Sequence, residues 1–165
     1  MTKNEKFQLV ENYIVENQND YYRLAFSYVK NKENALDIIQ DSILKALKSI
    51  DNLEETQYIR TWFYRIVINT SLDFIRKHGR MQAWDDDMLH SILPEQHDLE
   101  KDYDLYEAID HLREPYKTII VLRYLEDLKI DEIAEIQNEN PNTIKTRIYS
   151  ALKKLRVNME KKVEA

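Results

Sequence analysis

Polar and basic side chains near the C-terminus have the spacing of a helix face that could hydrogen-bond to DNA. Asn142, Lys145, Thr146, Tyr149 and Lys153 recur at intervals of three or four residues, and an α-helix places such residues on one side. Amide and hydroxyl groups on this side can contact base edges in a major groove, and lysines can contact the flanking phosphates. The spacing therefore predicts a helix that reads duplex DNA.

The elements around this face have the pattern of a helix-turn-helix. Apolar residues on the opposite side of the helix would pack on preceding helices: Ile144, Ile148, Ala151, Leu152 and Leu155. A short apolar helix around 130–136 comes before it, and its small residue Ala134 lets the two helices cross closely. Asn140 and Pro141 suit an N-cap and a first helical position. The pattern alone fits equally well an amphipathic helix whose basic face is only solvated.

A second candidate site lies between residues 34 and 44, where a helical pattern places acids and an amide side by side. Asp37, Gln40 and Asp41 stand at i, i+3 and i+4, so they share a face, and Leu36 flanks them. Such a face could pair with a basic helix of a partner protein. A solvated surface explains this cluster more simply when it is taken by itself.

A third candidate site follows at 58–80, where aromatic residues alternate with cations. Rings can stack on unpaired bases while cations hold the backbone, so the pattern is typical of a surface for single-stranded nucleic acid. The aromatic residues are Tyr58, Trp62, Phe63 and Tyr64, and the polar ones are Arg60, Arg65, Asn69, Arg76, Lys77 and Arg80. Some of the aromatic residues are expected in the core. Trp62 and the neighbouring Ile66 should be largely buried.

Composition excludes several classes of protein. The chain has 165 residues, one Gly and no Cys, which excludes Gly-rich phosphate loops, turn-rich β folds, disulfides and thiolate zinc sites. No apolar run approaches the roughly 18 residues of a membrane span, and the N-terminus has no signal-peptide core, so a cytoplasmic protein is expected. Apolar residues recur at helical spacing almost throughout, which predicts an all-α fold.

The net charge of −6 would argue against a nucleic-acid partner, but the charge is unevenly distributed. Residues 85–107 carry −8, whereas residues 141–165 carry +5. A negative total built in this way says little about a local surface.

The periodicity predicts two small helical domains joined by an acidic linker. Helices are expected at 7–14, 21–28, 35–47, 58–77, 105–112, 115–122, 130–136 and 141–160, the fourth ending at a C-cap near Gly79. Residues 80–98 lose the periodicity. The expected division is therefore a first domain at 1–80, a linker at 81–104 and a second domain at 105–165.

Four blocks in this order resemble the extracytoplasmic-function (ECF) class of bacterial RNA polymerase sigma factors. LDIIQD (36–41) is similar to the polymerase-binding motif of region 2, and WFYRIVIN (62–69) with LDFIRK (72–77) is similar to its promoter-melting block. Residues 112–136 resemble the opening of region 4, and residues 142–155 resemble its recognition helix. The resemblance covers roughly residues 20–80 and 105–157.

The resemblance implies a role for each candidate residue. Leu36, Asp37, Gln40 and Asp41 would bind the clamp helices of the polymerase β′ subunit, and the second domain would meet the β flap. The loop 49–59 would hold a base flipped out of the −10 element. The −10 contacts would be Asn52, Tyr58, Arg60, Arg65, Asn69, Arg76, Lys77 and Arg80. The −35 contacts would be Asn142, Thr143, Lys145, Thr146, Arg147, Tyr149 and Lys153.

The function that the resemblance implies is promoter-specific transcription initiation on core RNA polymerase. Promoter DNA and an anti-sigma factor are the further partners expected. In this family the anti-sigma factor is often anchored in the membrane. The alternative is a stand-alone helix-turn-helix regulator. An enzyme is disfavoured, because His78, His90, His97 and His111 lack metal-ligand spacing and no nucleophile–base pair is evident. The run Asp85–Asp87 reads more simply as linker than as a Mg²⁺ site. No metal, cofactor or small-molecule substrate is expected.

Overall fold

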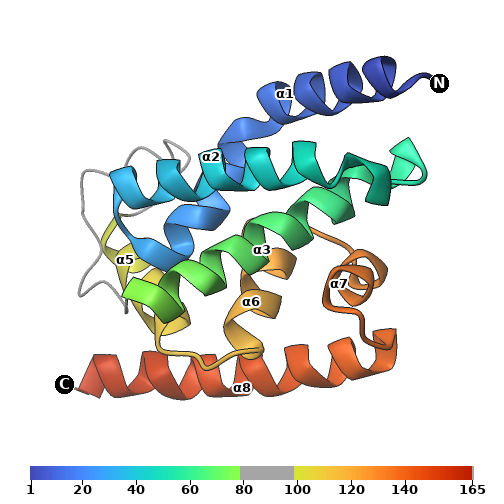
Figure 1. The fold of residues 1–165 in the computed structure, drawn as a ribbon. Helices are drawn as coiled ribbons and strands as arrows, with labels where there is room; N and C mark the ends of the chain where they lie inside the picture. The colour runs from blue at the N-terminus through green and yellow to red at the C-terminus, as the bar shows by residue number, and fades with distance from the viewer. Residues whose placement is uncertain (79–98, 165) are drawn as a thin grey trace. The chain divides into compact units, whose positions relative to one another are not determined.

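The structure, a computed structural model, describes residues 1–78 and 99–164. Every element in these two ranges is a helix, which confirms the all-α class (Figure 1). The chain divides into two compact units, Met1–Met81 and Gln82–Ala165. The predicted cap at Gly79 and the aperiodic stretch 80–98 lie outside the described residues, and the finer domain limits stay a prediction.

The first unit is a bundle of three helices that all pack on one another: α1 (Lys3–Val29), α2 (Lys32–Lys48) and α3 (Ile59–His78). Two short 3₁₀ turns, η1 (Ile50–Asn52) and η2 (Thr56–Tyr58), join α2 to α3. The prediction of separate helices at 7–14 and 21–28 is wrong, because α1 is continuous through both. The polar stretch 16–20 interrupts the apolar period but contains no Pro or Gly that would end a helix.

An aromatic cluster joins α1 to α3. Tyr21 is 1% exposed, and its ring centroid lies 4.6 Å from that of Phe63 and 4.6 Å from that of Tyr64. Its hydroxyl lies 2.5 Å from the hydroxyl of Tyr13. Burial, with Tyr13 beside it, raises the pKa of Tyr21 above its ordinary range, so the hydroxyl stays protonated and able to donate.

Small hydroxyl residues lie among the apolar residues on the buried sides of α2 and α3. Ser42 and Ser71 are fully buried, and each donates to a carbonyl of its own helix, Ser42 to Ile38 at 2.7 Å and Ser71 to Val67 at 2.8 Å. Their polar groups are thus satisfied inside the bundle without a cross-helix partner.

The second unit contains α5 (Leu99–Asp110), α6 (Tyr116–Ile120), the π-helical turn η3 (Val121–Leu125), α7 (Ile130–Gln137) and α8 (Pro141–Glu164). Helices α5, α6 and α7 each pack on α8. Helix α5 begins earlier than predicted, since residues 100–104 are mostly charged and carry little apolar signal. Helix α6 begins one residue after Pro115, which takes the N-cap position.

A capping contact and the burial of Ala134 confirm the predicted helix-turn-helix. The Asn142 amide donates to Oδ1 of Asn140 at 2.8 Å, so Asn140 is the N-cap of α8. Ala134 is 4% exposed in α7, which packs against α8. On α8, Ile144 and Ala151 are fully buried as expected, but Leu152 is 39% exposed and lies outside the core.

A buried ion pair holds α5 against α6. Lys117 Nζ lies 2.8 Å from Asp110 Oδ1, and the two side chains are 1% and 11% exposed. Taking a charge out of water costs free energy that a nearby opposite charge offsets, so removal of one member takes this compensation away from the other.

Lys117→Met should therefore destabilise the second unit by about 3–5 kcal/mol, measured by urea unfolding. Lys129→Met, a change at an exposed lysine of the same unit, should leave the midpoint within about 0.5 kcal/mol. A loss at position 117 no larger than that of the control would contradict a role for the ion pair in stability.

Candidate functional site

The acid-amide-acid face lies on the outside of α2. Leu36, Asp37, Gln40 and Asp41 are all exposed, Leu36 to 43%. The opposite side of the helix is anchored by apolar residues and by Ser42, which keeps the four side chains outward. Lys45 Nζ lies 3.4 Å from Asp41 Oδ2, so one of the two acids already has a cation beside it. The structure thus brings the four predicted residues together on one accessible surface.

Lys45 also ties this face to α3. Its ammonium donates to Thr70 Oγ1 at 3.3 Å, and Thr70 in turn donates to the Ile66 carbonyl at 2.7 Å. Lys45 therefore contacts both an acidic residue of the α2 face and a residue of α3.

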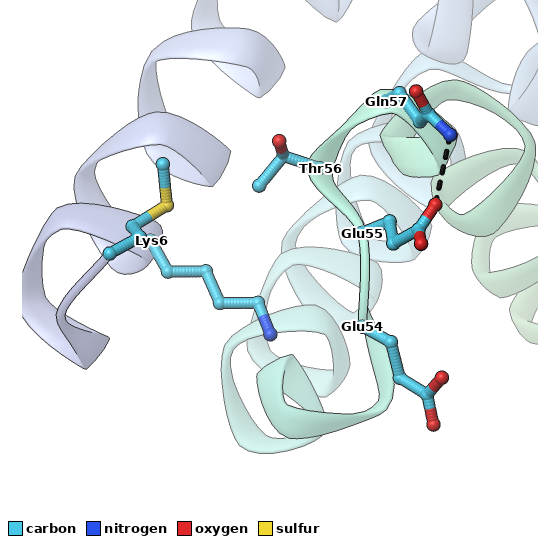
Figure 2. Close-up of a pocket in the computed structure, with 6 residues that line it drawn as sticks. Lys6, Glu54, Glu55, Thr56 and Gln57 are labelled. Atoms are coloured by element: carbon cyan, nitrogen blue, oxygen red, sulfur yellow. Dashed lines mark hydrogen bonds between the residues drawn. The ribbon is translucent and has the colours of Figure 1, made fainter.

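The connection between α2 and α3 forms an open hollow with the N-terminal end of α1. The hollow has a volume of about 650 Å³ and is lined by Met1, Lys6, Glu54, Glu55, Thr56 and Gln57 (Figure 2). Gln57 Nε2 donates to Glu55 Oε2 at 2.9 Å. Asn52 and Tyr58, both predicted −10 contacts, are exposed in the same connection. The loop is thus accessible on one side and bounded on the other by α1.

Helix α3 presents a polar stripe along its outer side. Arg65, Asn69 and Arg76 are exposed and stand at i, i+4 and i+11, which aligns them on one face. Arg60 is also exposed, but at 100° per residue it lies about 140° around the helix from Arg65. The stripe and Arg60 are therefore two separate patches.

The remaining predicted −10 contacts lie near the C-terminal end of α3. Lys77 is exposed off the stripe, and Arg76 pairs with Asp73 on the preceding turn. Arg80 lies outside the described residues.

The aromatic residues of this segment divide between core and surface. Phe63 and Tyr64 are buried, whereas Tyr58 is 47% exposed. Trp62 and Ile66 keep partial exposure, so the expectation that these two are largely buried holds only in part. Tyr58 and Trp62 are the rings of this set that remain accessible for stacking.

The DNA-reading face predicted on α8 is exposed as a continuous stripe. Asn142, Lys145, Thr146, Tyr149 and Lys153 are all exposed, and Tyr149 reaches 75%. Each lies opposite the buried residues of the same helix. Five of the seven predicted −35 contacts therefore form one surface.

The other two predicted −35 contacts, Thr143 and Arg147, are only partly exposed. Arg147 Nη1 lies 3.2 Å from Glu139 Oε1, a carboxylate in the turn before α8. With 30% of the arginine side chain and 38% of the glutamate side chain exposed, the pair clamps the turn to the side of the recognition helix. The Glu139 carboxylate thus occupies one donor of the guanidinium that was predicted to contact DNA.

The described ranges contain neither a candidate metal site nor a membrane-spanning helix. No group of three or more His, Asp or Glu side chains in them could hold a metal ion. None of their helices has the length and apolar character needed to cross a membrane. Two of the four histidines and the Asp85–Asp87 run lie outside these ranges.

Each of the two units matches a family of known proteins. Residues 13–81 match the family model described as Sigma-70 region 2, and residues 103–155 match the model described as Sigma-70, region 4. The chain is 49% identical over 148 residues to "RNA polymerase sigma factor SigV" of Bacillus subtilis (strain 168), an alignment that covers 90% of this chain and 89% of that protein. It is 31% identical over 150 residues to "ECF RNA polymerase sigma factor SigW" of the same organism, covering 82% and 80%. The chain belongs to the ECF group of RNA polymerase sigma factors.

Solved structures share the fold at low sequence identity. The sigma factor RpoE in complex with the anti-sigma factor NepR, from Bartonella quintana, has a TM-score of 0.71 at 20% identity and covers 91% of this chain and 96% of its own. CnrH in complex with the cytosolic domain of CnrY has a TM-score of 0.70 at 18% identity and covers 92% and 87%. At these identities the likeness concerns the fold.

Two features of these surfaces had not been predicted from the sequence. The Glu139–Arg147 pair joins residues eight apart across a turn, a spacing that no helical rule singles out. Lys6 lines the hollow with residues 54–57, almost fifty positions later in the chain. Lys6 lies beside residues 54–57 because α1 packs along α2 and α3.

Glu139→Gln should strengthen binding of the free protein to a −35 duplex by about two- to five-fold, since Arg147 is released and one carboxylate near the phosphates is lost. Fluorescence anisotropy at fixed salt measures the change. The gain should shrink in an Arg147→Ala background, because the pair is then already broken.

Asp131→Asn, which removes one exposed carboxylate at the start of α7, serves as the matched control for charge alone. Equal gains from the two substitutions would show that the Glu139–Arg147 pair does not restrain DNA binding.

Proposed function

We propose that the chain docks on core RNA polymerase through α2, opens the −10 element with the η1–η2 loop and α3, and reads the −35 element with α8. The observation that carries this proposal is the presence of both sigma regions in one chain, each with its predicted polar face exposed. The stand-alone regulator is not favoured, because it leaves the region 2 match at 13–81 without a role.

The α2 face suits a partner surface that is basic and partly apolar. Asp37 and Asp41 offer carboxylates, Gln40 offers an amide, and Leu36 adds an exposed apolar contact. Buried charge pairs across such an interface set specificity as well as affinity. The β′ clamp helices are the proposed partner, and the β flap is the proposed contact of region 4.

Region 2 would open the −10 element by rewarding an unstacked base. Unstacking costs a few kcal/mol, so a site that binds the extruded base makes strand separation favourable at the right sequence. Exposed Tyr58 and Trp62 supply rings, and the stripe of Arg65, Asn69 and Arg76 supplies contacts to the strand. Asn52, Arg60, Lys77 and Arg80 complete the proposed set.

Region 4 would read the −35 duplex with the exposed stripe of α8. Lys145 and Thr146 lie in the second turn, where side chains of a recognition helix reach base edges. Tyr149 and Lys153 lie further along, and Thr143 and Arg147 lie at the edge of the stripe. The proposed role is non-enzymatic, since polymerisation chemistry belongs to the polymerase.

An anti-sigma factor is the proposed regulatory partner. The two solved structures compared above are complexes, one with the anti-sigma factor NepR and one with the cytosolic domain of CnrY.

Run-off transcription with purified core polymerase over a promoter library tests the proposal as a whole. Transcripts that start at a shared pair of motifs only when this chain is added are the expected result. A protein that instead footprints an operator without polymerase would be the stand-alone regulator.

Asp37→Arg should weaken binding to core polymerase by at least about tenfold, because it places a cation opposite a basic partner. The fold should be unaffected, since the side chain is exposed. Pull-down with core enzyme measures the loss, and Glu11→Arg, at an exposed acid of α1, is the control. Equal binding by both variants would remove α2 from the interface.

Lys145→Ala should cost about 1–3 kcal/mol of −35-dependent promoter binding if the ammonium donates to a base edge. Loss of discrimination at one base position identifies that contact. A uniform loss across sequences, with the salt slope reduced by about one, would instead make Lys145 a phosphate contact. Lys129→Ala, outside α8, is the control and should change neither quantity.

A further inference from the structure

The N-terminal end of α1 lies beside the promoter-opening loop although it precedes the region matched to the family. The region 2 match begins at residue 13, yet Met1 and Lys6 line the hollow with residues 54–57. Lys3 Nζ also lies 3.9 Å from Asp51 Oδ2 in η1. The first two turns of α1 thus form a wall of the hollow that the family match does not include.

The loop itself lacks positive charge. Between positions 49 and 59 the sequence has Asp51, Glu54 and Glu55 but no Lys or Arg. A DNA strand carries a negative charge at every phosphate, so an acidic loop alone would repel the backbone that must pass it. A cation that reaches the loop from another element would offset this repulsion.

Lys6 supplies that cation. Figure 2 shows its ammonium reaching from α1 toward the loop, with Thr56 directed back toward the helix. The side chains of Glu54 and Glu55 point to the other side of the loop, where Gln57 donates to Glu55 at 2.9 Å. The side chains of Lys6 and Thr56 therefore lie on the side of the loop that faces α1, in a hollow that Glu54 and Glu55 also line.

The element that carries Lys6 is held in place. Thr2 and Glu5 form a reciprocal cap, with the Glu5 amide 3.2 Å from Thr2 Oγ1 and the Thr2 amide 3.3 Å from Glu5 Oε2. Val10 and Ile14, one and two turns further along, are 0% and 4% exposed. A cation on a rigid helix contributes more to binding than one on a frayed end, because less freedom is lost.

We infer that Lys6 and Thr56 bind a backbone phosphate of the opened −10 strand, next to the base that the loop accepts. Ammonium and hydroxyl groups are common donors to phosphate oxygens, and such contacts set the register of a strand without reading its sequence. The volume of about 650 Å³ lies within the roughly 300–1,000 Å³ of ligand pockets, so a sugar-phosphate unit can enter. The inference rests on the proposed role of region 2 in opening the −10 element.

The test uses the full chain in complex with core polymerase and a labelled single-stranded oligonucleotide that carries the non-template −10 sequence. Lys6→Gln should weaken binding by about two- to five-fold and lower the salt slope by about 0.7, the value for one phosphate contact on a single strand. Thr56→Val should weaken binding without changing the slope. Lys32→Gln, at an exposed lysine of α2 outside the hollow, is the matched control and should change neither quantity.

The possible failures are distinguishable. If the wild-type complex binds the −10 strand better than a scrambled strand while Lys6→Gln retains wild-type affinity and slope, the inference is wrong and the proposed function stands. Equal losses from Lys6→Gln and Lys32→Gln would also overturn it, because the effect would then be general charge. If the wild-type complex does not prefer the −10 strand, both the inference and the proposed role of region 2 fail.

Discussion

The packing of Tyr21 against Phe63 and Tyr64 determines which side of α3 faces out. These three rings are almost completely buried and lie with centroids 4.6 Å apart in two pairs. Aromatic pairs of this kind add to the stabilisation from buried area and prefer tilted or edge-on geometry, so they fix the rotation of one helix against the other. With Phe63 and Tyr64 turned inward, the 3.6-residue period turns Arg65 and Asn69 outward.

The same constraint extends to the other surfaces of the first unit. Once α3 is fixed on α1, the buried apolar residues of α2 and the Lys45–Thr70 contact hold α2 beside it, and Asp37 and Gln40 face outward. The continuous α1 then brings Lys6 to the loop between α2 and α3. One small bundle therefore holds three polar surfaces whose separation is set by helix packing.

In the second unit, buried residues likewise determine which side of a helix is exposed. Ile144 and Ala151 fix α8, and the Asp110–Lys117 pair closes α5 against α6. The outer stripe of α8 keeps the local positive charge of the C-terminal segment, although the chain as a whole carries −6. The proposed binding to DNA would depend on that local field, and the acidic residues 85–107 dominate only the total.

Helix positions and exposed faces were largely predictable, because apolar periodicity records which side of a helix is buried. The predicted faces on α2 and α8 are exposed, as expected. Asn140 caps α8 because its short side chain accepts from the N–H of Asn142, the second residue of the helix. Prediction failed where periodicity carries no signal. The polar stretch 16–20 reads as a break but continues as helix, and Leu152 fits the apolar spacing but is 39% exposed.

The amino-acid sequence by itself determined the helical class, the order of the two sigma regions and most residues of the polar faces, since these follow from local period, capping and motif. Only the tertiary structure decided that Arg147 is held by Glu139 and that Lys6 faces residues 54–57. The physical reason is that contacts between distant segments depend on how helices rotate and cross when they pack. A periodic pattern specifies which side of a helix is buried, but not which residue of another helix that side meets.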